Sequence, residues 1–263
     1  ERETMLKAGI FLDIENLSRN GGWGMRFDVV KKLAEAQGTV VLRANAYLAV
    51  DTRLEREDEE YKKKTRAFRD AIRRNGFHLI FKEVKRYVDS EGQVVLKANA
   101  DLDLAVDALL QAENLDYVLL GSGDGDFLRL VRALQNKGKR VDVLAFAHTS
   151  ADLRQEADFF FSGALVPGLL PADDGDPERK RGVIHHIVED KGYGFLMVQT
   201  GLGLNDVMYN VFCHITEVTE NGEPIDDMSF RRLYERKAIL EFDLAEQADG
   251  RYQATDVREY SWT

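Results

Sequence analysis

Short apolar runs alternate with helical patterns from residue 8 to residue 161 of this chain. Two of the runs, Ile10-Phe11-Leu12 and Tyr117–Leu120, have the composition of parallel strands that are buried on both faces. The helical patterns between the runs predict that the strands join into a parallel sheet. We therefore expect the α/β fold class, with strands near residues 8–13, 39–48, 77–88, 117–121 and 140–146.

Acidic residues stand where two of these strands end. Asp13 follows the first run, and Ser122, Asp124 and Asp126 follow the fourth. In open α/β sheets ligands bind beyond the carboxyl ends of the strands, so neighbouring strands would bring these side chains together. Crowded carboxylates raise one another's pKa or bind a cation, and oxygen ligands without cysteine or clustered histidine favour Mg²⁺ or Mn²⁺ over zinc. Taken alone, Asp13 would serve to end its strand and Asp124 or Asp126 to cap the helix that follows, but the group favours a metal site.

A third acidic motif, Ala100-Asp-Leu-Asp-Leu-Ala-Val-Asp107, carries three more carboxylates on a predicted helix. The expected core stripe of this helix consists of Leu102, Val106, Leu109 and Leu110. At about 100° per residue, Asp103 and Asp107 lie about 40° apart, whereas Asp101 lies about 120° from Asp107. The three cannot all bind one metal ion, and the spacing leaves open which of them does.

Charge is distributed unevenly along the chain. The net charge of −10 argues against a simple basic nucleic-acid binder, but residues 1–170 are nearly neutral and the excess of acid lies beyond them. A predicted helix over residues 57–75 carries the main basic stretch, and its expected buried stripe is Tyr61, Thr65, Phe68 and Ile72. Another face of this helix carries four cations, Lys62, Arg66, Arg69 and Arg73. Beside a nuclease centre they would follow a phosphate backbone; otherwise they would form a solvated surface.

The C-terminal part has a different pattern. Residues 169–181 are rich in proline, glycine and acid, which predicts a linker between an N-terminal domain of residues 1–168 and a second domain of residues 182–263. Five short alternating segments follow the linker and predict a small all-β barrel. They are residues 182–188, 194–198, 209–215, 238–244 and 252–257.

Several classes of protein are excluded by composition. No apolar stretch approaches the roughly 20 residues that a membrane helix needs, so we expect no membrane span. The only cysteine, Cys213, excludes an internal disulfide and a thiolate zinc site, and we expect it to be a small buried hydrophobe. The single cysteine and the absence of a recognisable secretion signal favour a cytoplasmic location.

The N-terminal part resembles an NYN domain of the LabA-like group, which is related to the PIN-domain nucleases. The resemblance rests on Asp13 with Asn16, on Lys97 followed by Asp101 and Leu104-Ala-Val-Asp107, and on Ser122-Gly-Asp-Gly-Asp-Phe127. It implies a PIN-like three-layer domain and metal-dependent cleavage of RNA phosphodiesters. The resemblance also implies that Mg²⁺ or Mn²⁺ is held by Asp13, Asp101, Asp124 and Asp126, that Asp107 supports the site, and that Asn16 and Ser122 position a turn or a phosphate.

The C-terminal part resembles a cold-shock domain of the OB-fold class. Lys191-Gly-Tyr-Gly-Phe-Leu196 matches the first RNA-binding motif of that family, and Val211-Phe-Cys-His-Ile215 matches the second. The resemblance implies that RNA binds here, with Lys191 beside rings that stack on unpaired bases: Tyr193, Phe195, Phe212 and His214. An aromatic core is the alternative for these rings, and the acidic barrel would alternatively be a docking surface for a protein.

Two hypotheses follow from the sequence. The first is a ribonuclease for single-stranded RNA, in which the barrel assists RNA binding. The second is a non-catalytic RNA-binding or scaffold protein built on an inactive nuclease fold. The presence of all four acids favours the first, and the sequence leaves open whether the chain forms a homo-oligomer.

Overall fold

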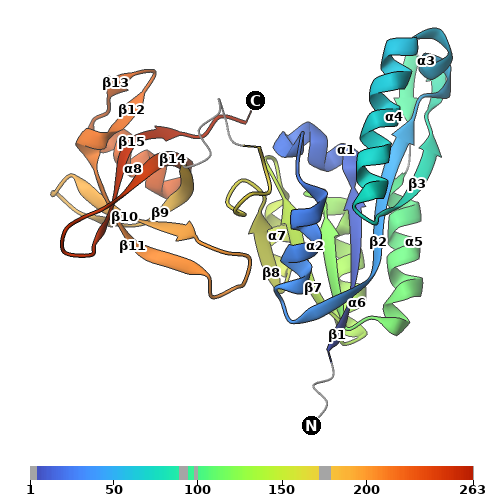
Figure 1. Ribbon diagram of the computed structural model, residues 1–263, viewed down its shortest axis with the longest axis horizontal. Helices are drawn as coiled ribbons and strands as arrows, with labels where there is room; N and C mark the ends of the chain where they lie inside the picture. Colours follow the sequence, from blue (N-terminus) through green and yellow to red (C-terminus); the bar gives the residue numbers. More distant parts are fainter. Residues whose placement is uncertain (1–4, 89–93, 98–99, 172–178, 263) are drawn as a thin grey trace. The chain divides into compact units, whose positions relative to one another are not determined.

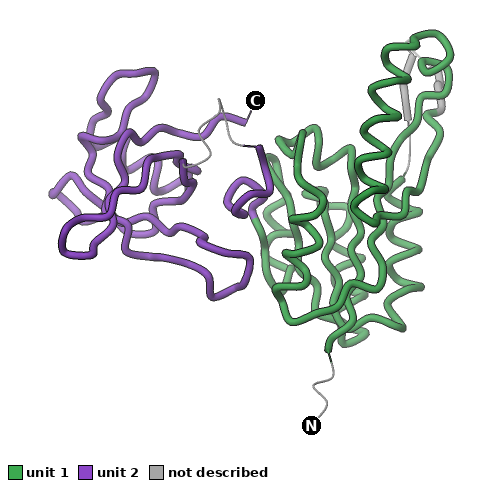
Figure 2. Tube along the Cα trace, viewed as in Figure 1, with its two compact units in different colours: residues 1–161 green, residues 162–263 purple. Residues whose placement is uncertain are grey.

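The computed structural model describes residues 5–88, 94–97, 100–171 and 179–262, and for residues 85–88 and 94–97 it describes the backbone alone. The chain divides into two compact units, Glu1–Phe161 and Ser162–Thr263, which Figure 2 distinguishes by colour. Residues 172–178 of the expected linker, and the side chain of Lys97, lie outside what is described. No described helix is long and apolar enough to span a membrane.

Unit 1 is built on a six-stranded sheet with the strand order β3-β2-β1-β6-β7-β8 (Figure 1). The five strands from β3 to β7 pair in parallel, which confirms the predicted α/β class. Their bounds are β1 Leu6–Asp13, β2 Thr39–Val50, β3 His78–Glu83, β6 Tyr117–Gly121, β7 Arg140–Ala145 and, at the far edge, β8 Phe159–Ser162. The expected strand over residues 77–88 is interrupted at Val84, and its second half forms a separate two-stranded sheet, β4 (Lys85–Val88) with β5 (Val94–Lys97).

Helices cover the sheet and complete the layers. They are α1 Ile14–Leu17, α2 Phe27–Glu35, α3 Thr52–Glu57, α4 Glu59–Arg74, α5 Ala100–Gln111, α6 Leu128–Asn136 and α7 Ala151–Glu156. Residues of α5, α6 and α7 share one core cluster with Phe11 of β1. Side chains alternate along a strand, so Ile10 and Leu12 point to the opposite face, where α2 lies in Figure 1.

The buried face of α5 differs from the predicted one. Leu102, Val106 and Leu110 are 61%, 44% and 68% exposed, whereas Leu104 and Ala108 are fully buried. Apolar residues occupy nearly every position of this helix apart from its three aspartates, so the pattern marks two stripes rather than one. The stripe that contains small alanines faces the sheet.

The predicted helix over residues 57–75 is present as α4, preceded by the short helix α3. Asp58 separates the two and caps α4, because its carboxylate accepts hydrogen bonds from the backbone N–H groups of Glu60 and Tyr61 at 2.9 Å. Of the expected stripe, Ile72 is fully buried and Phe68 is half-buried.

Unit 2 contains a closed five-stranded barrel of the OB-like type, as the sequence predicts. The order is β11-β10-β9-β14-β15, and Phe212 of β11 pairs with Gln253 of β15 to close it. The bounds are β9 Lys180–Val188, β10 Tyr193–Gln199, β11 Val207–His214, β14 Ile239–Glu246 and β15 Tyr252–Glu259. Three further elements were not expected: β12 Val218–Glu220, β13 Glu223–Pro224 and α8 Asp227–Glu235. Helix α8 buries Phe230 and Leu233 in the barrel core, which also contains the fully buried Cys213.

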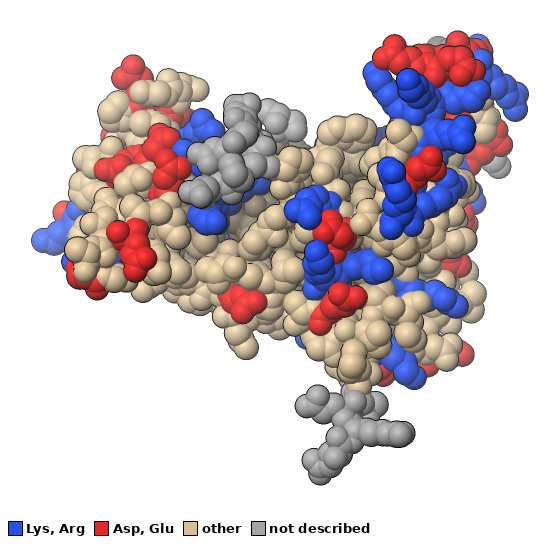
Figure 3. All heavy atoms as spheres, in the orientation of Figure 1, with Lys and Arg blue, Asp and Glu red and all other residues tan. Residues whose placement is uncertain are grey.

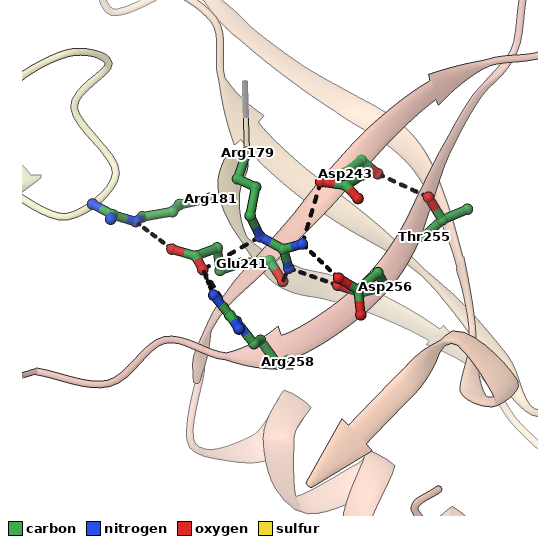
Figure 4. Close-up of polar contacts among 7 residues, drawn as sticks. All are labelled: Arg179, Arg181, Glu241, Asp243, Thr255, Asp256 and Arg258. Atoms are coloured by element: carbon green, nitrogen blue, oxygen red, sulfur yellow. Dashed lines mark hydrogen bonds and ion pairs between the residues drawn. The ribbon is translucent and has the colours of Figure 1, made fainter. Parts of the chain in front are cut away.

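A buried carboxylate joins the first barrel strand to the last two. Glu241 of β14 is 3% exposed and forms ion pairs with Arg179, Arg181 and Arg258 at 3.4, 3.3 and 2.9 Å (Figure 4). Burial opposes ionisation, but the hydrogen bonds from Arg258 and Arg181 hold the pKa of Glu241 below its usual value. The network fixes the start of the barrel against β14 and β15.

Candidate metal centre and RNA-binding surfaces

The adjacent strands β1 and β6 end side by side, and the candidate metal centre begins at their carboxyl ends. Leu12 pairs with Gly121 in the sheet, so the residues that follow them, Asp13 and Ser122, lie side by side at the ends of the two strands. The Ser122 hydroxyl donates a hydrogen bond to the Asp13 carboxylate at 3.2 Å. Asp13 also caps α1 by accepting a hydrogen bond from the backbone N–H of Asn16 at 3.1 Å.

The glycine-rich segment after β6 is held against the same helix. The Asn16 side-chain oxygen accepts a hydrogen bond from the backbone N–H of Gly123 at 2.8 Å. Asp124 caps the following helical turn, η3 (Gly125–Phe127), by accepting from the backbone N–H of Asp126 at 3.0 Å. A Cβ atom on Gly121 would lie 2.4 Å from a methyl group of Leu12, so this glycine is needed for close packing.

Burial and neighbouring charge oppose ionisation of Asp13. Its side chain is almost fully enclosed, and burial, together with the charges of Asp101 and Glu15, raises its pKa to about 6. The hydrogen bonds from Asn16 and Ser122 act in the opposite direction. A carboxylate that is partly protonated near neutral pH would be ionised by a nearby cation.

Asp101 brings a third element to the centre. It lies in the first turn of α5, and its pKa is raised by burial and by the charges of Asp124, Asp126 and Glu15. The charge of Asp101 therefore acts on Asp13 of β1, and the charges of Asp124 and Asp126, in the segment after β6, act on Asp101. Glu15 is an additional acid that sequence reasoning missed, although it stands between Asp13 and Asn16 in the first motif.

The candidate ligands of this centre are of the type that a hard divalent cation binds. All of the candidate ligands are carboxylate oxygens, the donors that Mg²⁺ and Mn²⁺ prefer. Among the described residues, no three His, Cys, Asp or Glu side chains are grouped closely enough to enclose a metal ion. Mg²⁺ usually keeps several waters and is bound by one or two carboxylates together with substrate phosphates. The arrangement therefore fits an ion shared with water and phosphate rather than one enclosed by protein.

The other two aspartates of α5 have different partners. Asp107 accepts a hydrogen bond from the Tyr47 hydroxyl at 2.8 Å, and Tyr47 in turn accepts from the Asn45 side chain at 3.3 Å. Asp103 forms an ion pair with Lys82 at 2.8 Å. Asp107 thus ties α5 to the buried strand β2, and Asp103 neutralises a lysine of β3.

The basic face of α4 is only partly available to a ligand. Figure 3 shows lysine and arginine side chains gathered over this helix. Lys62 pairs with Glu59 and Arg73 with Asp70, whereas the half-buried Arg69 pairs with Glu55 and lies over the Phe81 ring. Among the described residues Arg66 forms no ion pair and is exposed, so it is the predicted cation best placed for a phosphate.

The aromatic residues of the barrel lie outside its core. Along β10 and β11, the half-exposed Tyr193, Phe195, Phe212 and His214 alternate with buried residues that point inward. Tyr193 pairs with His214 and Phe195 with Phe212 across the two strands, and the ring centroids of Tyr193 and Phe212 are 5.2 Å apart.

A pocket of about 540 Å³ opens beside three of these rings, Tyr193, Phe195 and Phe212. The pocket is also lined by Asn210, Arg251 and Gln253. Lys191 is exposed in the turn before β10. The rings therefore form an outward-facing surface rather than the alternative aromatic core.

Comparison with known protein families finds a match in the N-terminal part of the chain. The NYN domain model matches residues 7–166. The low amplitude and bright protein LabA of Synechococcus elongatus is 32% identical over 82 residues, which make up 30% of this chain and 44% of LabA. The chain thus spans less than half the length of this relative.

A solved structure shares the fold. The crystal structure of a protein of unknown function from Vibrio parahaemolyticus has a TM-score of 0.51 and 27% sequence identity, and the match covers 62% of this chain and 95% of that one. The region matched by the NYN domain model contains all four candidate metal ligands.

Proposed function

Because the chain belongs to the NYN domain family, a branch of the PIN-like nucleases, we propose that it is a Mg²⁺- or Mn²⁺-dependent ribonuclease for single-stranded RNA. The observation that carries the proposal is that β1 and β6 end side by side, where Ser122 holds Asp13, while Asp101 opposes ionisation of Asp13 and is itself opposed by Asp124 and Asp126. Repelling carboxylates at the end of a parallel sheet are costly unless a cation binds them.

The residues have separate roles in the proposed reaction. Asp13, which is buried, would hold the cation at the end of β1, and the half-buried Asp101 and Asp124 and the exposed Asp126 would share it with water and phosphate. When bound, the cation lowers the pKa of a water and neutralises charge on the phosphate. Ser122 and Asn16 keep the Asp13 carboxylate and the Gly123 backbone in place, and Asp107 orients α5 through Tyr47.

The barrel contributes affinity for the same class of ligand. Exposed rings stack on bases of any sequence only when those bases are unpaired, which favours single strands over duplexes. Lys191 and His214 flank the rings and would meet the phosphate backbone. The excess acid of the C-terminal part limits this affinity by repulsion, and it also supports a second candidate role for the barrel, docking of a protein partner.

The proposal is tested with end-labelled single-stranded RNA incubated with Mn²⁺ or Mg²⁺. We expect cleavage by the unmodified protein, and loss of cleavage with EDTA, with Asp13→Asn and with Asp124→Asn. Asp103→Asn is the matched control, because this aspartate pairs with Lys82 and should leave cleavage unchanged. If the RNA stays intact with either metal but its mobility shifts in a gel, the protein binds RNA without cleaving it. That result would contradict the nuclease proposal in favour of a non-catalytic RNA-binding protein.

A further inference from the structure

Trp23 presents an aromatic ring to solvent on unit 1. Its side chain is 69% exposed, although indole is among the largest apolar groups that a protein can bury. The residues around it in sequence, Arg19, Gly24 and Arg26, are also exposed. An isolated ring in polar surroundings is too small for a stable protein interface, which needs a larger apolar patch.

The backbone that carries Trp23 is well defined. The backbone N–H of Met25 donates to the carbonyl of Gly22 at 3.1 Å. Trp23 has φ −61° and ψ 132°, and Gly24 has φ 77°. These values describe a type II turn with tryptophan at its second position and the required glycine at its third. Gly22 packs so tightly on Phe146 that a Cβ atom would lie 2.4 Å from that ring. The turn is therefore anchored to the core.

The indole ring is also held from below. It stacks on Phe68 of α4 with ring centroids 5.7 Å apart and an interplanar angle of 20°. Phe68 makes an edge contact with Phe27 at 6.2 Å, and Phe27 makes one with Phe77 at 5.6 Å. A row of four rings thus connects the exposed indole to the buried interior. Preorganisation of this kind lowers the entropy that a ligand must pay to stack on the ring.

Trp23 lies at the same end of the sheet as the metal centre, beyond the carboxyl ends of the strands. Residues 14–22 run from Asp13 to Trp23 as α1 and the irregular helical turn η1 (Ser18–Gly22), a path on the order of 10–15 Å at helical rise. The carbonyl of Asn20 accepts a hydrogen bond from the backbone N–H of Ala147, just beyond the carboxyl end of β7. Helix α4 reaches the end of this path, because its Phe68 stacks on Trp23.

We propose that Trp23 is a stacking platform for an unpaired base of the RNA strand whose phosphate lies at the acidic centre. This inference rests on the proposed function and adds a binding site to it. A base on the open face of the indole would be sandwiched against a ring that is already fixed. Stacking of this kind tolerates any base, because every base has an aromatic face. The platform would therefore favour single strands without selecting a sequence.

Tryptophan fluorescence tests this proposal directly. The chain has two tryptophans, so Trp262→Phe leaves Trp23 as the only one. Short single-stranded RNA is added to this variant in EDTA, and then with Mn²⁺ by rapid mixing before cleavage. Anisotropy of a labelled copy of the RNA reports binding independently. We expect the emission of Trp23 to be quenched as RNA binds, and a matched duplex to quench it much less.

Affinity measurements complete the test. We expect Trp23→Ala to weaken single-strand binding roughly 5- to 100-fold, Trp23→Phe to retain most of it, and Leu110→Ala, equally exposed on α5, to leave it unchanged. RNA that binds without changing Trp23 emission overturns the proposal while leaving the nuclease intact. Emission that changes on dilution of the protein alone, and not with RNA, overturns it in favour of a contact between copies. If RNA quenches the emission of Trp23 but is not cleaved, the nuclease proposal is overturned and the stacking role of Trp23 is kept.

Discussion

The hydrogen bond from the Ser122 hydroxyl to the Asp13 carboxylate joins residues that are 109 positions apart in the sequence. It exists because β1 and β6 are neighbours in the sheet and end at the same level. The contact fixes a carboxylate whose ionisation burial opposes, and it places the glycine-rich segment beside it. The chemistry proposed for this protein depends on that adjacency.

Replacement of Asp13 by asparagine should stabilise the metal-free protein at neutral pH. The pKa of Asp13 is raised from 3.8 to about 6 in the folded state. Ionisation of Asp13 therefore costs the native state on the order of 3 kcal/mol above pH 6, and this cost disappears as the pH falls below about 4. We expect Asp13→Asn to unfold at higher urea concentration than the unmodified protein at pH 7.5 and at the same concentration near pH 4. A less stable variant at pH 7.5 would contradict the buried repulsion.

Two arginines of α4 should differ in what they contribute. Arg66 is exposed and forms no ion pair among the described residues, so Arg66→Ala should weaken RNA binding and lower the dependence of log K on log salt by about 0.7. Arg69 is paired with Glu55 and half-buried, so Arg69→Ala should cost about 1–2 kcal/mol of stability instead. Salt titrations of RNA affinity and urea unfolding separate the two effects. Equal salt slopes for Arg66→Ala and the unmodified protein would exclude a phosphate contact.

The aromatic surface of the barrel should bind unpaired bases. Phe212 contacts Tyr193, Phe195 and His214 at the centre of that surface. Phe212→Ala should lower the affinity for single-stranded RNA by roughly 5- to 100-fold, the loss of one stacking contact. Met228→Ala on α8, which is 68% exposed, is the control. If both variants bind RNA as well as the unmodified protein does, the surface serves another ligand.

Loss of the buried charge at Glu241 should destabilise the barrel. Glu241→Gln leaves Arg179, Arg181 and Arg258 without their shared carboxylate, and removal of one member of a buried ionic group costs about 3 kcal/mol or more. Asp243→Asn also removes a contact to Arg179, but this side chain is half exposed, so the expected change is within about 0.5 kcal/mol. Urea unfolding monitored by Trp262 emission, in a Trp23→Phe background, compares the two. Equal stability of both variants would show that the network is not stabilising.

Much of the fold follows from the sequence, because strand and helix periods are local properties. The buried runs that became β1 and β6 are apolar throughout, and the barrel strands alternate, so both units are predictable. The buried face of α5 is not predictable, because apolar residues on two sides of the helix make its hydrophobic period ambiguous. The close packing of Ala108 determines which face is buried. Glu15 and Trp23 were missed for a different reason: their roles depend on Asp101 and Phe68, partners that only the tertiary structure brings close.

Direct measurement of Mn²⁺ binding tests the metal centre most plainly. Isothermal titration at pH 7.5 would compare the unmodified protein with Asp101→Asn and Asp103→Asn, two changes in the first turn of one helix. We expect Asp101→Asn to weaken Mn²⁺ binding at least about 10-fold, because it removes a carboxylate whose pKa is raised by the charges of Asp124 and Asp126. We expect Asp103→Asn to bind as the unmodified protein does, because its carboxylate pairs with Lys82. Equal Mn²⁺ affinity in all three proteins would contradict the assignment of this acidic cluster as a metal centre.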